Sequence, residues 1–181
     1  MNKKLRLVVT DCCHNQCPLC CNKRYDMTQL PVVDRWDYDE VMITGGEPSL
    51  FSNRVRELVE SIRTLDAASG KSRKIYMYTA VYSSTFVAYL LDCLDGIVAS
   101  PHNQRDVVQF VELVKQIEWG QTCGHKDYSD KSFRLNLFPE VKKQLPPDID
   151  LSKWQIKDME WLDDCPVPDG EDLRRIDKLF V

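Results

Sequence analysis

The first β-prone run of the chain and the loop after it read LRLVVT and DCCHNQCPLCC, residues 5–21. A second β-prone run, residues 41–44, ends directly in Gly45-Gly46-Glu47-Pro48. Parallel α/β sheets and barrels place their ligands at the carboxyl ends of their strands. These two loops are therefore the first candidates for a functional site.

Three further β-prone runs cover residues 75–79, 97–99 and 133–137, and stretches with helical periodicity separate them. Apolar residues recur there at three- and four-residue steps, in the sets Val55, Leu58, Val59, Ile62 and Leu65; Phe86, Val87, Leu90, Leu91 and Leu94; and Val107, Phe110, Val111, Val114 and Ile117. Ser52 is a plausible cap for the first helix and Gly70 a stop, while Asn103 or Asp106 opens the third. Strands that alternate with helices predict βαβ units and a parallel sheet in an α/β fold.

The later part of the chain is less regular. In residues 133–137, apolar side chains alternate with Arg134 and Asn136, which indicates either an edge strand with one wet face or a strand facing a polar lumen. Residues 151–162 fit a strand or a helix equally well, and residues 121–132 indicate a loop. Residues 169–180 are predicted to form a terminal helix, because three apolar residues recur at three-residue steps.

Composition indicates an ordinary globular protein. The 181 residues suit a single domain, and no apolar run approaches the roughly 20 residues that cross a bilayer. A net charge of −4 with interleaved signs argues against a nucleic-acid partner. The N-terminus is a poor secretion signal, because Arg6 and Asp11 interrupt its apolar stretch. We therefore expect a cytoplasmic protein with no membrane partner.

The eight cysteines are unusual for such a chain, since five of them lie between Cys12 and Cys21. Clustered thiols in a reducing compartment indicate a metal site. Cys13, Cys17 and Cys20 form a Cx3Cx2C pattern, which can bind three irons of a cubane cluster and leave the fourth open.

A zinc site is the alternative, with Cys17 and Cys20 joined by two further ligands. Those ligands would come from the set Cys12, Cys13, Cys21, Cys123 and His125. We favour the cluster, because the second CxxC of a typical structural zinc site is missing. Cys12, Cys21 and His14 are expected near the cluster without binding it.

The Gly-Gly-Glu-Pro motif also has two interpretations. Taken alone it is an ordinary turn, in which Pro48 begins the next segment. Two glycines at a strand end also let a ligand approach the backbone closely. A cationic amine would then meet backbone carbonyls, with Glu47 adding charge or fixing the turn.

Together, the cysteine pattern and the Gly-Gly-Glu-Pro motif one strand later resemble the radical-SAM superfamily, over about residues 5–138. The resemblance implies a partial, open parallel (β/α) barrel of about five or six strands, with residues 139–181 completing a single domain. It implies a [4Fe-4S] cluster that cleaves S-adenosylmethionine (SAM) reductively, and an electron donor such as flavodoxin or ferredoxin.

The resemblance also assigns residues. Cys13, Cys17 and Cys20 would bind the cluster, while Gly45, Gly46 and Glu47 would lie against the SAM amino group. Four weaker assignments are Thr79 near SAM, Ser100 near the ribose, and Arg134 and Asn136 on the SAM or substrate surface.

The chain departs from the family pattern in three respects. Leu19 stands where the family usually has an aromatic residue, and only about 20 residues separate the cysteine loop from the second strand. Few strands follow the fifth, so we expect a wide mouth that suits a large substrate or a partner.

Three functions within the superfamily fit so short a chain. They are an activase for a glycyl-radical enzyme, an enzyme resembling the small deazaguanine synthase of queuosine biosynthesis, and a peptide-modifying enzyme. Cys93, Cys123 and Cys165 are too dispersed to indicate an auxiliary cluster, which disfavours the last. We favour a small-molecule substrate, with a peptide or protein as the alternative. Outside the superfamily, the alternative is a non-enzymatic zinc-binding interaction module.

Overall fold

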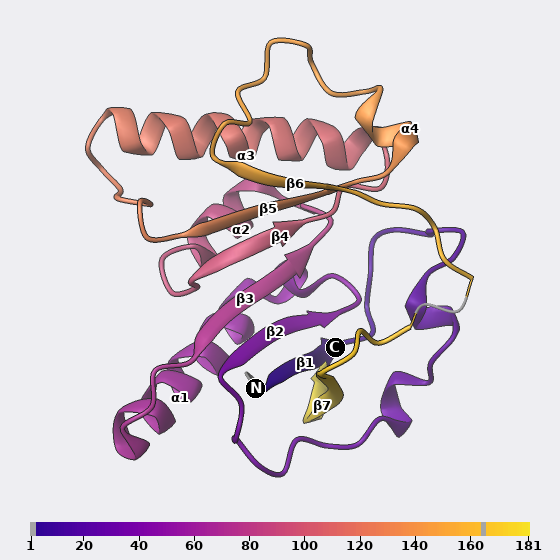
Figure 1. Cartoon of the computed structure of the whole chain (residues 1–181), viewed down its shortest axis with the longest axis vertical. Helices are drawn as coiled ribbons and strands as arrows, with labels where there is room; N and C mark the ends of the chain where they lie inside the picture. Colours follow the sequence, from indigo (N-terminus) through magenta and orange to yellow (C-terminus); the bar gives the residue numbers. More distant parts are fainter. Residues whose placement is uncertain (1–2, 164–165) are drawn as a thin grey trace.

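The computed structural model describes residues 3–163 and 166–181, and its strands form one parallel sheet (Figure 1). The strands are β1 (Lys4–Thr10), β2 (Glu40–Gly45), β3 (Lys74–Thr79), β4 (Gly96–Ala99), β5 (Ser132–Leu137), β6 (Trp154–Asp158) and β7 (Glu171–Phe180). The helices are α1 (Ser52–Ser69), α2 (Ser84–Leu90), α3 (Gln104–Thr122) and the short α4 (Pro139–Lys142). Three 3-10 turns are η1 (Cys21–Lys23), η2 (Met27–Gln29) and η3 (Pro48–Phe51).

The strand order is β6-β5-β4-β3-β2-β1-β7, and all the pairings are parallel. The predicted open parallel α/β fold is confirmed. The described sheet has seven strands rather than five or six, because the C-terminal part adds one strand to each edge. All five β-prone runs of the sequence are strands of this sheet.

The two faces of the sheet differ in what covers them. Helices α1, α2 and α3 pack on one face, where residues such as Val59, Leu90 and Phe110 join the strands in a single apolar core. The other face has only a small buried cluster of Met42, Tyr76 and Val98. It is therefore the face that remains available for a ligand.

The ends of the helices follow from local chemistry. Gly70 ends α1 in the left-handed conformation at φ 65°, as expected for a glycine stop. Ser52 is the first residue of α1 and not its cap, because η3 leads directly into the helix. Of the two candidates for the third helix, Asn103 is the cap, and its side chain accepts from the Asp106 N–H.

The prediction of a terminal helix was wrong: residues 171–180 form strand β7. Leu173 pairs with Arg6 of β1, and the Thr10 hydroxyl donates to the Phe180 carbonyl at 2.8 Å. Without β7, the outer edge of β1 would carry unpaired backbone groups, and pairing them outweighs a local helical pattern. Residues 154–158, for which the sequence allowed either structure, form β6.

The connection between β1 and β2 contains only the short turns η1 and η2, as its length predicts. This segment crosses beside β7, where the Val33 N–H donates to the Arg175 carbonyl at 2.9 Å. In the described residues, none of the helices is long and apolar enough to cross a membrane.

A cavity lined by the cysteine loop and the strand ends

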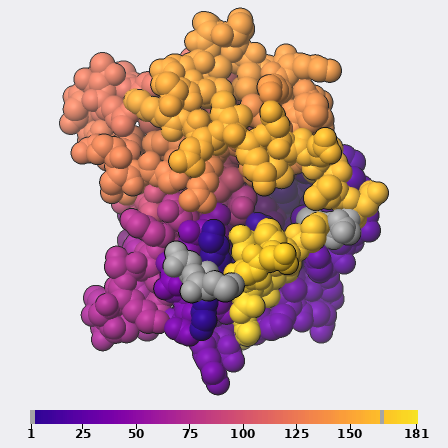
Figure 2. All heavy atoms as spheres, viewed as in Figure 1, coloured from indigo at the N-terminus to yellow at the C-terminus, as the bar shows by residue number. Residues whose placement is uncertain are grey.

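A cavity of about 890 Å³ opens on the uncovered face of the sheet, at the carboxyl ends of the strands. Figure 2 shows a hollow on this face, between the indigo and purple N-terminal segment and the orange and yellow C-terminal segment. All of the predicted site residues line this cavity: Cys13, Cys17, Cys20, Gly45, Gly46, Glu47, Thr79, Ser100, Arg134 and Asn136. Strand ends that are far apart in sequence therefore share one site.

The three predicted ligands are free thiols with different exposures. Cys13 is exposed, Cys20 is half-buried, and Cys17 is only 8% exposed. Burial raises the pKa of Cys17 to about 12, and the negative charges of Cys20 and Cys13 add to the rise. Deprotonation of Cys17 is therefore opposed both by its burial and by these two neighbouring cysteines.

A single-ion site would require these thiols to converge with further ligands on one point. Among the described residues, no group of three or more Cys, His, Asp or Glu side chains is arranged to hold one metal ion. Within the part of the chain that the structure describes, Cys13, Cys17 and Cys20 therefore line one cavity without being arranged around a single ion.

Three of the four other candidate zinc ligands do not line the cavity. Cys123 and His125 lie at the end of α3, where the His125 ring packs 5.4 Å from the Trp119 ring, and neither lines the cavity. The Cys12 thiol donates to Asp11 at 3.7 Å and also does not line it. Cys21 lines the cavity beside Cys20 but is disulfide-bonded in this structure, so it offers no free thiolate. Cys165 lies outside the described residues.

The two glycines allow the β2 turn to pack against the cysteine loop. A Cβ at Gly45 would lie 2.2 Å from the Thr10 carbonyl oxygen, and one at Gly46 only 1.9 Å from that of Cys12. The Gly46 N–H donates to Thr10 O at 2.7 Å, and the Glu47 N–H to Cys12 O at 2.8 Å. The turn therefore fixes the backbone where the cysteine loop begins.

Glu47 fixes its own turn to the end of β3. One carboxylate oxygen accepts from the Ser49 hydroxyl at 2.5 Å and the Thr79 hydroxyl at 2.7 Å, and the other accepts from the Ala80 N–H at 2.7 Å. Burial raises the pKa of Glu47, and these hydrogen bonds oppose the rise. Of the two roles considered for this carboxylate, its contacts within the chain support the turn-fixing one.

Backbone strain lies beside this network. Val81 is fully buried and adopts a positive φ of 64°, which is rare for a β-branched residue. Its N–H donates to the Thr79 hydroxyl at 2.8 Å, which holds the strained turn in place. Such strain persists where the surrounding contacts over-determine the backbone.

Asp106, at the start of α3, holds the other side of the cysteine loop. Its fully buried carboxylate contacts His14 Nε2 at 3.0 Å and accepts from the Asn15 side chain at 2.6 Å. Burial alone would lower the pKa of His14, but hydrogen bonds with Asp106 and Cys13 raise it to about 9. The sequence indicated Asp106 only as the start of a helix. Its contacts with His14 and Asn15, about 90 residues earlier, could not be predicted from the neighbouring residues in the sequence.

His102, which follows β4, contacts a predicted ligand directly. Its ring Nδ1 lies 3.1 Å from Cys17 Sγ, and its backbone N–H donates to the Asp106 carboxylate at 3.0 Å. Its ring lies 5.2 Å from that of Trp161, which stacks on Phe138 at 4.1 Å. Sequence reasoning missed His102 and Trp161, because both meet the site through long-range packing.

Ser100, Arg134 and Asn136 lie together on the opposite side of the cavity. The Asn136 amide donates to the Ser100 hydroxyl at 3.0 Å. Strand β5 is internal, since β6 pairs with it, so the edge-strand interpretation is wrong. The lumen interpretation agrees with the position of both β5 side chains on the cavity.

No family model matches this sequence, and no curated protein matches it.

Proposed function

We propose that this chain is a radical-SAM enzyme that acts on a small molecule. The observation that carries the proposal is the convergence of the cysteine loop, the Gly-Gly-Glu-Pro turn and the four weaker candidates on one cavity. These residues were selected from the sequence, through two motifs and the family resemblance, and they come from five separate segments of the chain. When bound, a [4Fe-4S] cluster with SAM would supply reductive sulfonium cleavage and a deoxyadenosyl radical for hydrogen abstraction.

In this proposal the chain provides the thiolates and keeps their loop in place. Cys13, Cys17 and Cys20 would hold the cluster, with His102 in contact with the Cys17 sulfur. Two anchors fix the loop: the β2 turn through backbone hydrogen bonds, and Asp106 through His14 and Asn15. Such rigid support is what a reactive centre requires.

A small substrate is favoured by the shape of the site. Residues 159–162, 166 and 168 line the cavity between β6 and β7, and we call this segment the strap. Trp161 fastens it by donating to Glu140 at 2.6 Å. A cavity of about 890 Å³ falls within the range of small-molecule pockets, about 300–1,000 Å³. The wide mouth expected from the sequence is therefore narrowed by the chain itself, which disfavours a peptide-modifying enzyme or an activase.

The experiment is anaerobic reconstitution of the full chain with iron and sulfide. We expect a brown protein with about four irons that converts SAM to deoxyadenosine when reduced chemically or by flavodoxin or ferredoxin. Cys17→Ala should lose the cluster, whereas Cys123→Ala, which removes an exposed thiol outside the cavity, should keep it. We also place the protein in the cytoplasm, where the free thiols of Cys13, Cys17 and Cys20 would stay reduced.

A colourless protein that retains one tightly bound zinc would refute the enzyme and support the interaction module. A Cys17→Ala variant with a complete cluster would show that another cysteine is the ligand.

A further inference from the structure

Two basic side chains on the cavity wall have no acidic partner among the described residues. Arg134 of β5 uses Nε for one hydrogen bond, to the Ser132 hydroxyl at 3.2 Å, and its guanidinium lies 4.5 Å from the Tyr76 ring centre. Lys157 of β6 is exposed and forms no ion pair with a described carboxylate. By contrast, Arg6, which also lines the cavity, is paired with Glu171.

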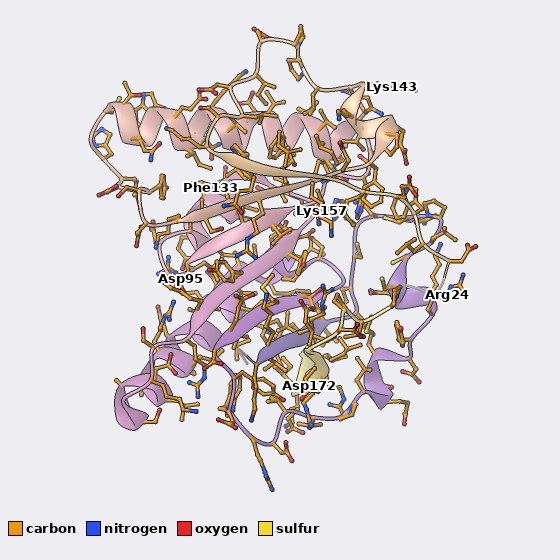
Figure 3. The ribbon with its side chains drawn as sticks, in the orientation of Figure 1. Arg24, Asp95, Phe133, Lys143, Lys157 and Asp172 are labelled. Carbon is orange, nitrogen blue, oxygen red and sulfur yellow. The ribbon has the colours of Figure 1, made fainter. Side chains whose placement is uncertain are left out.

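The strand register brings these two cations to one place. Arg134 pairs with Gln155, and Asn136 with Lys157, so the four side chains form a block on one face of two neighbouring strands. All four line the cavity, and Trp154 points to the opposite face, where it packs against Phe133. Strand spacing places the Arg134 and Lys157 Cα atoms about 8 Å apart, within reach of a common group. Figure 3 shows Lys157 on β6, beside the open face of the sheet.

The acidic residues that line the same cavity do not neutralise this pair. Both oxygens of Glu47 are occupied by donors of the chain, and the residue is only 1% exposed. Glu160 lies on the exposed strap and forms no ion pair with either cation. Arg134 also keeps its terminal N–H groups free of partners within the described residues, in the forked geometry that suits oxyanions.

We propose that Arg134 and Lys157, helped by the amides of Asn136 and Gln155, bind an oxyanion of the substrate, a carboxylate or a phosphate. The substrate would then extend from β5 and β6 toward the cysteine loop and the β2 turn, which line the other side of the cavity. Its role as the substrate subsite rests on the proposed function, whereas oxyanion binding itself requires no cluster.

The test is a titration of the full ¹⁵N-labelled chain with inorganic pyrophosphate and with malonate, followed by NMR shifts. We expect saturable shifts at the Arg134 Nε–H and at the β5 and β6 amides. Loss of one charged hydrogen-bond donor should weaken binding about tenfold in Arg134→Gln and in Lys157→Gln. Arg134→Lys, which keeps the charge but not the fork, should bind more tightly than Arg134→Gln.

The matched control is Lys143→Gln, because Lys143 lies outside the cavity beyond α4 (Figure 3) and the substitution removes the same charge. It should bind both anions like the unchanged chain. Equal weakening in this control would indicate long-range charge only and overturn the proposal. Absence of saturable shifts with either anion would overturn it as well. Tighter binding of pyrophosphate would assign a phosphate to the substrate, and tighter binding of malonate a carboxylate.

A second arm separates the substrate from SAM, which carries its own carboxylate. SAM is titrated into the reconstituted chain and into its Arg134→Gln and Lys157→Gln variants. Unchanged SAM affinity with weakened anion binding assigns the subsite to the substrate. An equal loss of SAM affinity would assign the pair to SAM and overturn the inference. Anion binding by a chain that does not cleave SAM would refute the proposed function alone.

Discussion

At the scale of single residues, Gly46 is the position where the β2 turn and the cysteine loop permit no side chain. The obstacle is backbone, since the nearest atom to an added Cβ is the Cys12 carbonyl oxygen at 1.9 Å. Neither the loop nor the turn can move without losing the hydrogen bond between Glu47 N–H and Cys12 O. Gly46 is therefore required by the contact between two segments and not by its own dihedral angles.

We expect Gly46→Ala to lower the free energy of unfolding by about 3 kcal/mol or more and to reduce cluster loading, because the loop must shift. Gly124→Ala is the matched control: Gly124 has φ 68° but nothing within 4 Å of an added Cβ. Gly124→Ala should lower the free energy of unfolding only by the strain of a left-handed alanine, about 1–2 kcal/mol, and should leave the iron content unchanged. Urea unfolding and iron analysis measure both. A similar loss in the two variants would contradict the steric argument.

The site residues that could be predicted are those that belong to short sequence motifs. The spacing of Cys13, Cys17 and Cys20 and the two glycines after β2 are local patterns, and the structure places all of them on the cavity. Asp106 and His102 were missed because their contacts with the loop join segments about 85–92 residues apart. A buried carboxylate that serves two segments has no signature until the chain has folded.

At the scale of elements, Asp95 joins one helix and two strands. It accepts from Arg63 of α1 at 2.5 Å, from the Ile75 N–H of β3 at 2.7 Å and from the Lys74 ammonium at 3.2 Å, just before β4 begins (Figure 3). Burial alone would raise the pKa of Asp95, but these donors together lower it below its usual value. The ionised carboxylate therefore stabilises the folded chain.

The sign of the pH dependence follows from this lowered pKa. Its stabilisation is complete above the unfolded pKa of about 3.9 and is lost as pH falls through the lower folded value. We expect Asp95→Asn to lose about 1–3 kcal/mol at pH 7 and to show a shallower decline in unfolding free energy below about pH 4. Asp130→Asn, which removes an exposed carboxylate 3.9 Å from Lys131, should leave the stability at pH 7 unchanged. Parallel acid declines for Asp95→Asn and the unchanged chain would exclude the role of Asp95.

The elements also show where sequence periodicity fails. The five β-prone runs and the three amphipathic stretches are found where expected, because most of their apolar residues join the core. Leu65 and Phe86 are the exceptions, since both side chains are exposed. Residues 171–180 have no strongly buried face, and their apolar residues recur at a helical interval. Their structure depends on the open edge of β1, about 165 residues earlier in the chain, which no local window contains.

At the scale of the whole molecule, the C-terminal part closes the fold by reaching both edges of the sheet. The chain adds β6 to β5, crosses the cavity as the strap and ends as β7 beside β1 (Figure 1). Next to the strap, the exposed Asp163 carboxylate lies 4.0 Å from the guanidinium of Arg24 in the N-terminal segment. Strand β7 covers the outer edge of β1, which would otherwise be free to pair with another chain.

Removing residues 171–181 should therefore both destabilise the chain and make it associate. The truncated chain loses the pairing of β1 with β7. It also loses the hydrogen bond from Tyr38 to Asp172 at 2.8 Å and the one from the Thr10 hydroxyl to the Phe180 carbonyl. We expect a loss of about 3 kcal/mol or more, which corresponds to about 6–12 °C in Tm, with dimers or larger species in size-exclusion chromatography. A chain lacking only Val181 keeps the whole ladder and should behave like the full chain.

Arg174→Pro separates strand pairing from chain length. Arg175 donates its N–H away from β1, to Pro31 O at 2.9 Å, so the N–H of its neighbour Arg174 faces β1, and proline removes it while all the other residues stay. It should reproduce part of the loss in Tm and part of the association. If the truncated chain stayed monomeric with an unchanged Tm, β7 would be a dispensable tail. The edge of β1 would then be stable without a partner.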